Sequence, residues 1–351
     1  MDRIYTFQFQ FTWPLVQMIR NVERIHMTWK SRHSSATFLE NRREEAGMSS
    51  VVSCAKIEGL SLSSEDLSSI KRQSFDDFSN SALDFSRGLL DVYAFLDSAS
   101  PEELIEEDCV KKVHELLTSY MALPDAHKGE YKSQDEMDNK GSAALPTLIT
   151  FRTTNPNELF SRSMSALFRW TKDNDNVDDL VKASLMAYEI YAVDAFNSYV
   201  GTLGRLMAGA YLKSRGYNWI VYLKLEREFE LRHREMQQIM AQCKMRRPNE
   251  DITPWIEFYL ECLLHALEGL PFDTSYERIK SANPSASDET LSPREERVLR
   301  FIEANPGTRS GEISQGVNIP VPTIKKMMAK FYRMALVNRF GQGRGTHYAM
   351  R

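Results

Sequence analysis

The residues of this chain best suited to bind a charged ligand are basic and lie near its C-terminal end. Lysine and arginine neutralise phosphate oxygens, and the N-terminal end of a helix points its positive dipole toward phosphate. Thr323, Lys325 and Lys326 occupy the first turns of a predicted helix that can enter a DNA major groove. The predicted DNA contacts are Thr323, Lys325, Lys326, Lys330, Arg333 and Arg344.

Three helices and a hairpin must position these side chains. Ser292, Pro293 and Glu295 provide an N-cap, a first helical residue and a capping-box partner for the first helix. A second helix is predicted at residues 310–317. Pro322 starts the third, whose inner seam consists of the apolar residues Ile324, Met327, Met328, Phe331 and Ala335.

Two short strands, at residues 336–340 and 346–350, then flank a glycine-rich basic tip that carries Arg344. This order of elements resembles the winged helix-turn-helix family, in which such a tip forms the wing. The resemblance implies that Arg344 reaches the DNA backbone or minor groove. A winged helix can also be a protein–protein module with solvated cations. We favour nucleic acid because residues 291–351 hold eleven Lys or Arg and four Asp or Glu, a charge of +7.

The overall charge conceals this difference between two parts of the chain. The 351 residues contain 44 Lys or Arg and 48 Asp or Glu, a net charge of −4. Residues 1–290 keep 33 basic and 44 acidic residues, so their charge is −11. A stretch rich in Ser, Pro and Asp predicts a linker at 271–290. We therefore expect an N-terminal helical region at 1–60, a main domain at 61–270 and a C-terminal domain at 291–351.

Composition excludes several classes of protein. With 42% hydrophobic residues, 16 Gly and 13 Pro, the chain is neither disordered nor collagen-like. Its cysteines (Cys54, Cys109, Cys243 and Cys262) form no C-x-x-C pair, and its histidines have no metal-site spacing, so we expect buried thiols and no metal. No apolar run reaches the roughly 18 residues of a membrane span. We expect a soluble, cytoplasmic protein.

Helical apolar spacing dominates residues 14–270. Two such stripes (Val177, Val181, Leu185, Tyr188 and Ala192; Leu203, Leu206, Met207, Ala210 and Tyr211) predict core helices on either side of residues 196–202. Further helices are predicted near 225–243 and 254–267, and a β-hairpin around 145–153. The expected fold class is mostly α.

The segment 192–217, AVDAFNSYVGTLGRLMAGAYLKSRGY, resembles the Fic family, whose active members carry H-P-F-x-D/E-G-N-G-R-x-x-R. Cys54 to Gly59 is similar to the family's inhibitory helix, S/T-x-x-x-E-G. Gly129, Tyr131 and Lys132 resemble the start of its target-docking flap. The resemblance implies a Fic-type helical bundle with a short β-hairpin flap, followed by the small winged helix domain. It also implies transfer of AMP from a nucleotide to a protein hydroxyl.

The motif is degenerate at the positions that carry this chemistry. The general base His is replaced by Asp194, and the metal-binding acid by Ser198. Tyr199 and Val200 replace the first Gly and the Asn of the phosphate nest, and Thr202 replaces the first Arg. We assign no catalytic residue. The matching positions are Asp194, Phe196, Ser198, Gly201, Thr202 and Arg205.

Glu58 matches the inhibitory Glu, and Arg205 matches the second motif Arg. The resemblance implies a salt bridge between them, which would act as a structural latch. The other interpretation is that both are inherited charges without this contact.

The leading hypothesis is a catalytically impaired Fic-like protein that binds DNA as a regulator, with the body serving as a dimerisation, docking or sensing module. It needs no cofactor. The alternative is an active nucleotidyltransferase that uses ATP with Mg and Asp194 as base. A third hypothesis is a scaffold that binds a partner peptide along the flap at 130–153.

Overall fold

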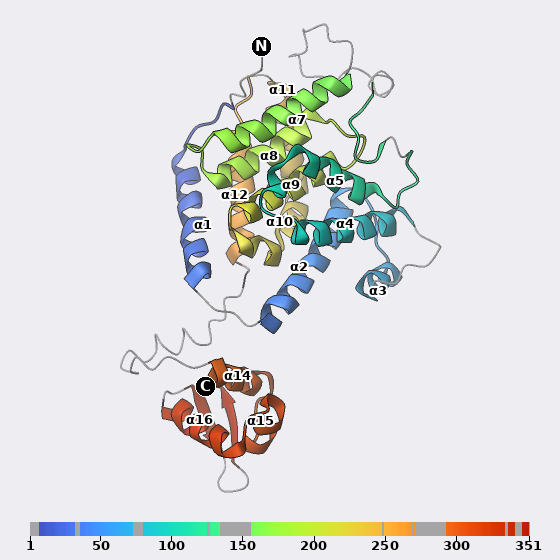
Figure 1. The fold of residues 1–351 in the computed structure, drawn as a ribbon. Helices are drawn as coiled ribbons and strands as arrows, with labels where there is room; N and C mark the ends of the chain where they lie inside the picture. The colour runs from blue at the N-terminus through green and yellow to red at the C-terminus, as the bar shows by residue number, and fades with distance from the viewer. Residues whose placement is uncertain are drawn as a thin grey trace. The chain divides into compact units, whose positions relative to one another are not determined.

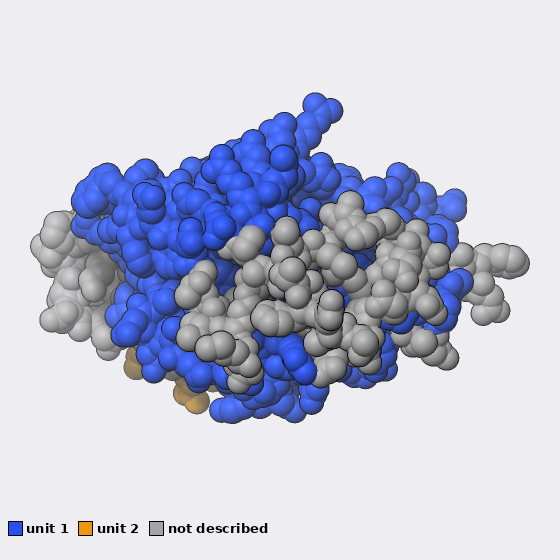
Figure 2. All heavy atoms as spheres, turned by 90° about the horizontal axis from the view of Figure 1, so that it is seen from above, with its two compact units in different colours: residues 1–270 blue, residues 271–351 orange. Residues whose placement is uncertain are grey.

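The computed structural model describes residues 7–31, 36–72, 80–124, 127–133, 156–247, 249–268, 270, 293–333, 336–340 and 346–350. The chain divides into two compact units, residues 1–270 and residues 271–351 (Figure 1; Figure 2). Several sequence predictions fall outside the described residues. These are the hairpin at 145–153, the linker at 271–290, the N-cap Ser292, the seam residue Ala335, the glycine-rich tip with Arg344, and the side chain of Arg333.

The described part of the first unit is helical, as the sequence predicts. Its α-helices are α1 (Trp13–Ser31), α2 (Ala36–Ile57), α3 (Ser64–Arg72), α4 (Ser81–Ser98), α5 (Glu107–Thr118), α7 (Pro156–Asp173), α8 (Asp179–Val193), α9 (Val200–Ser214), α10 (Leu225–Leu231), α11 (His233–Met245) and α12 (Thr253–Glu268). Two short 3-10 helices, η1 (Glu103–Ile105) and η4 (Asn218–Tyr222), complete them.

Helix α8 lies at the centre of this unit, with α9 packed against it (Figure 1). Of its fifteen residues, all but Asp179 and Tyr191 are buried, which is typical of a core helix. Gly204 permits the close packing of α9, because a Cβ there would lie 2.6 Å from the carbonyl oxygen of Ala187. The predicted pair of core helices around residues 196–202 is confirmed.

The prediction of a single helix near 225–243 is wrong, because the structure has two helices there. Arg232 separates α10 from α11 with φ −109° and ψ 25°. Its guanidinium binds Glu235 at 2.8 Å and Glu261 of α12 at 2.9 Å. These ion pairs connect the junction of α10 and α11 to α12.

The second unit contains α14 (Pro293–Ala304), α15 (Ser310–Val317), α16 (Val321–Arg333) and an antiparallel pair of strands, β1 (Val337–Phe340) and β2 (His347–Met350). In the pairing register, Val337 lies opposite Met350 and Phe340 opposite His347. A separate core includes Val298, Ile302, Ile313, Ile324, Phe331 and Tyr348. The helix predicted at 310–317 is confirmed, and Asn318, with φ 52°, ends it.

Among the described residues, no helix is both long and apolar enough to cross a membrane. All four cysteines are buried and free. Burial raises the pKa of Cys109 and of Cys262 to about 12, so these thiols stay protonated at neutral pH.

Candidate functional site

The loop between α8 and α9 carries most of the degenerate motif positions. Asp194 ends α8 with φ 53°, and Tyr199 begins α9 with φ 56°. A residue with a side chain is uncommon in this left-handed region, and for a bulky aromatic it is strained. Tyr199 therefore keeps a backbone conformation that suits glycine, which is the residue of the active motif at this position.

Tyr199 turns its ring toward α4 and packs on Phe85, with ring centroids 4.9 Å apart. Burial raises the pKa of its hydroxyl, and the negative charges of Glu58 and Asp84 add to this effect. Phe196 is buried, and it stacks on His114 of α5 at 4.4 Å and contacts Tyr131 at 5.0 Å. These aromatic contacts fix the loop against α4, α5 and the start of the flap.

Asp194, at the position of the motif base, is bound by the flap residue Lys132. The Lys132 ammonium lies 2.9 Å from the Asp194 carboxylate and donates to the Asp194 carbonyl at 2.7 Å. The backbone N–H of Lys132 also donates to Ala195 at 2.9 Å. The side chain of Asp194 is 27% exposed, so this ion pair lies at the edge of the site.

The other two flap residues are structural. Tyr131 is buried and donates a hydrogen bond to Glu107 at 2.8 Å. Gly129 has φ 74°, and its N–H donates to Nδ1 of His114 at 3.1 Å. This contact ties the flap to α5.

His114 of α5 packs against Phe196 of the motif loop. No motif in the sequence indicates this contact. It is fully buried, and burial lowers its pKa to about 4. Nδ1 accepts from Gly129, and a contact of the ring with the Ser198 backbone partly offsets the lowering of the pKa. Because it is fully buried and its Nδ1 is occupied by the Gly129 N–H, His114 is not placed to take a proton from a substrate.

Glu58 and Arg205 do not form the salt bridge predicted from the sequence. Thr202, which occupies the first Arg position, donates to Glu58 at 2.6 Å and accepts from Arg205 at 3.0 Å. The charge partner of Arg205 is Glu226 of α10, at 2.7 Å. Glu226 thus neutralises the arginine, and the Thr202 hydroxyl bridges Glu58 and Arg205 in place of a direct pair.

The end of α2 places Glu58 at this site. Gly59 has φ 75°, and the N–H of Leu60 donates back to the Ala55 carbonyl at 2.8 Å, which ends the helix. Cys54, one turn earlier, is buried, and burial raises the pKa of its thiol well above the usual value. We refer to Glu58, which is half-buried, and the buried residues Thr202, Arg205 and Glu226 as the Arg205 network.

Ser198, at the metal-acid position, is buried at its hydroxyl and has no partner among the described residues. Within the same described part of the chain, no three His, Cys, Asp or Glu side chains are grouped as metal ligands. Lys244 of α11 is a further cation near this loop that sequence reasoning missed. Its ammonium lies 5.2 Å from the Tyr191 ring centroid, and burial lowers its pKa while the charge of Asp194 opposes that shift.

The second unit presents its own candidate surface on α16. Lys325, Lys326 and Tyr332 are exposed, and Tyr332 keeps 60% of its surface accessible. Thr323 is half-buried rather than outside. Lys330 is also half-buried and pairs with Glu295 of α14 at 2.9 Å. Its positive charge is therefore neutralised within the unit. Sequence reasoning missed Tyr332 because an aromatic on an apolar helix is usually counted as core.

Comparisons with known proteins give the class of fold. No protein family model matches the chain, and no curated protein matches it. A Fic family protein from Desulfovibrio desulfuricans G20 is similar in structure, with a TM-score of 0.61 and 16% identity over 99% of this chain and 98% of that one.

Two further solved structures are also similar to this chain. A Fic domain signaling protein from Bacteroides thetaiotaomicron has a TM-score of 0.53 and 17% identity over 72% of this chain and 100% of that chain. Fic-1 from C. elegans has a TM-score of 0.56 and 15% identity over 74% of this chain and 73% of that chain. The body of this protein therefore has the Fic fold, as the motif resemblance implied.

Proposed function

We propose that this protein binds DNA through its second unit, a winged helix, and that its Fic-fold body does not transfer nucleotides. The observation that supports DNA binding most directly is the exposed face of α16. Lys325 and Lys326 lie there side by side in sequence, exposed and without an ion-pair partner in the described residues. Exposed lysines on a helix that follows a helix and a turn suit contacts with the DNA backbone.

The motif residues support the second half of the proposal because they do not fit a magnesium nucleotide. The metal-acid position is a buried serine hydroxyl, and the first phosphate-binding Arg is Thr202, already bonded to Glu58. Arg205 is committed to Glu226. Phosphoryl transfer depends on positioned cations around the phosphates, so we assign no transfer step to this site.

DNA binding is tested with the full chain and a mixed-sequence duplex at low salt. Lys325→Ala/Lys326→Ala should weaken binding by at least about tenfold, because two phosphate contacts are lost. The matched control is Arg294→Ala/Arg297→Ala, which removes two exposed cations from α14 in the same unit. The control should change affinity by less than about threefold. Equal losses in both variants would show that only net charge matters and would contradict a role for α16.

One observation favours the alternative of an active transferase: the Asp194 carboxylate remains partly exposed beside Lys132 and near Lys244. Incubation with labelled ATP, GTP or CDP-choline and Mg or Mn tests it directly. We expect no label on the protein or on lysate proteins. Label that disappears in Asp194→Ala but persists in Asp173→Ala, a change at an exposed residue, would replace our proposal with the transferase.

A further inference from the structure

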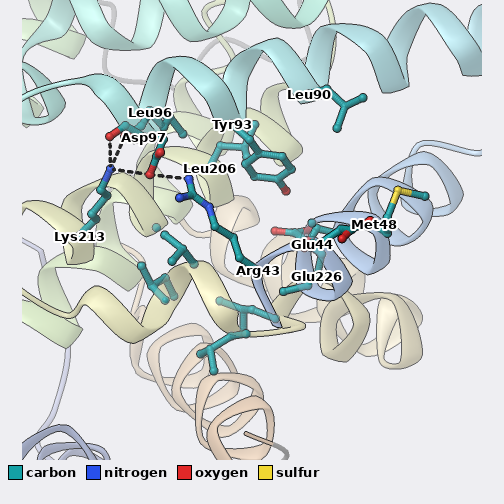
Figure 3. Close-up of a pocket in the computed structure, with 18 of the residues that line it drawn as sticks. Arg43, Glu44, Met48, Leu90, Tyr93, Leu96, Asp97, Leu206, Lys213 and Glu226 are labelled. Atoms are coloured by element: carbon teal, nitrogen blue, oxygen red, sulfur yellow. Dashed lines mark hydrogen bonds and ion pairs between the residues drawn. The ribbon is translucent and has the colours of Figure 1, made fainter. Parts of the chain in front are cut away.

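A cavity of about 450 Å³ lies in the first unit, beyond the motif loop. Residues of α2, α3, α4, α9 and the segment 220–226 line it, and Figure 3 shows side chains from its wall. Of the motif positions, Arg205 alone reaches it. Its volume is within the range of small-molecule sites, roughly 300 to 1,000 Å³. The wall is mainly apolar and includes Met48, Leu90, Leu96, Leu206, Ile220 and Leu225.

Two helix-interior glycines add to this space. Gly47 of α2 and Gly209 of α9 both line the cavity. A Cβ on Gly47 would meet nothing within 4 Å, and one on Gly209 would first meet Ile220, another residue of the wall, at an ordinary 3.9 Å. Packing therefore requires neither glycine, although glycine is less favourable than alanine inside a helix.

Two other helix glycines differ in this respect. A Cβ on Gly88 would lie 2.5 Å from a carbonyl oxygen of α5, and one on Gly204 would lie 2.6 Å from a carbonyl oxygen of α8. Helix packing explains Gly88 and Gly204. What Gly47 and Gly209 provide is room in the cavity.

The charges along the wall balance. The described residues of the lining include four cations and four carboxylates, namely Arg43, Lys71, Arg205 and Lys213 against Glu40, Glu44, Asp97 and Glu226. A ligand with a net charge therefore meets no excess of the opposite charge. Moving such a ligand from water to an apolar wall without a counter-charge is strongly unfavourable. The composition of the wall thus favours an uncharged molecule.

Five of these eight charges are bound to partners within the protein. Arg205 donates to Glu226 at 2.7 Å, and both side chains are buried. The Lys213 ammonium donates to two backbone carbonyl oxygens, at 2.6 and 2.9 Å. Arg43 pairs with the Asp97 carboxylate at 2.5 Å (Figure 3). The other three are exposed, where water screens them: Glu40, Glu44 and Lys71.

Two hydroxyls, of Ser50 and Tyr93, are the uncharged polar groups among the described side chains of the lining. Ser50 donates to the Tyr93 oxygen, a contact that opposes the rise in the Tyr93 pKa caused by burial. Because a phenol has one hydrogen to donate, that hydrogen remains for an acceptor on a ligand. In Figure 3 the Tyr93 ring extends from α4, and its hydroxyl points into the space between the labelled side chains.

We propose that this cavity binds an uncharged, mainly hydrocarbon molecule that carries one hydrogen-bond acceptor, such as a ketone or an ester. Its apolar body lies against Gly209 and the aliphatic side chains of the wall, and Tyr93 donates to its acceptor. The wall stabilises the body by removing it from water, and the Tyr93 donor orients it. The inference does not depend on DNA binding, and it is tested in the absence of DNA.

The experiment is equilibrium dialysis of the full chain against 2-decanone at physiological salt, with the ligand measured by chromatography on both sides. Decylamine and decanoate, kept below the concentrations at which they form micelles, are the cationic and anionic comparisons. We expect the ketone to bind at least about fivefold more tightly than either ion. An ion that binds as tightly as the ketone, or a ketone that does not bind, would overturn the proposal.

Gly209→Leu tests the location, because the new side chain extends into the cavity. It should weaken 2-decanone binding by at least about tenfold. Ala241→Leu adds a leucine at an exposed position of α11 outside the lining, and it should leave binding unchanged. Ketone binding that survives Gly209→Leu would refute the proposal. If Gly209→Leu does not fold, Gly47→Met fills the cavity from α2 and replaces it in the same comparison.

Tyr93→Phe tests the donor, because it removes the hydroxyl and keeps the ring. It should weaken 2-decanone binding by about threefold, the effect of one lost hydrogen bond. Tyr120→Phe removes the same group from a tyrosine that donates to Asp91 and does not line the cavity, and it should have no such effect. An unchanged affinity in Tyr93→Phe, or equal losses in the two variants, would overturn the contact with Tyr93.

Discussion

The motif site in the first unit and the α16 face in the second unit use charge in opposite ways. In the first, Asp194 binds Lys132, Arg205 binds Glu226, and Thr202 bridges Glu58 to Arg205. In the second, Lys325 and Lys326 are exposed and unpaired within the described residues. Charges that are paired and buried hold helices together, whereas exposed cations remain available to a partner.

The largest effect is expected in the Arg205 network, where buried charges pair. Arg205→Ala leaves Glu226 buried without a cation, so we expect a loss of about 3 to 5 kcal/mol in the free energy of unfolding of the first unit. Arg215→Ala is the control, because the Arg215 side chain is 47% exposed and its pair with Asp179 should contribute less than about 1 kcal/mol. Urea unfolding followed by circular dichroism measures both, and similar losses would contradict the difference we draw between buried and exposed charge.

The second test is the pH dependence of the first unit. Burial disfavours the charged form of His114 and lowers its pKa in the folded chain to about 4, from an ordinary value of 6.5. As the pH falls from 6.5 toward 4, His114 is protonated in the unfolded chain but not in the folded chain. Stability is therefore lost over this window, by about 3 kcal/mol in total, and the loss levels off below it.

Thermal unfolding at a series of pH values, compared between the wild type and His114→Asn, isolates this contribution from the carboxylates that titrate nearby. Asparagine keeps an acceptor for the Gly129 N–H but does not titrate in this range. We expect a shallower pH dependence in the variant. Identical profiles would show that His114 is not held neutral by burial.

A smaller effect is expected at Thr202. Thr202→Val keeps the shape of the side chain but removes both hydrogen bonds, to Glu58 and from Arg205. We expect a loss of about 1 to 2 kcal/mol in the free energy of unfolding. Thr202→Ser, which keeps the hydroxyl, should lose less, and an equal loss in both variants would exclude the bridging role.

Sequence patterns predicted the positions of the helices better than the side-chain contacts between them. The apolar stripes of α8 and α9 placed both helices, and the bounds of α15 agree with prediction, because helix periodicity is encoded locally. Asp194 lies at the end of α8, whereas Thr202 and Arg205 lie on α9 and make contacts of their own. The break at Arg232 was missed because its ion-pair partner Glu261 belongs to a later helix.

The partners within the site could not be predicted in the same way. Glu226 lies 21 residues after Arg205, and Lys132 lies 62 residues before Asp194. His114 reaches Phe196 from α5, across an even longer separation in sequence. Such contacts depend on how helices pack, and no single local pattern specifies them. The direct Glu58 to Arg205 salt bridge was wrong for this reason, since the competing partner Glu226 carries no motif.

The salt dependence of DNA binding tests the central claim most directly, because its slope counts the phosphates that the protein neutralises. The affinity of the full chain for a duplex should fall steeply with salt. Lys325→Ala/Lys326→Ala should reduce that slope by about 1.8, or 0.9 for each lost phosphate contact. An unchanged slope in the double variant would show that α16 does not bind DNA and would contradict the account.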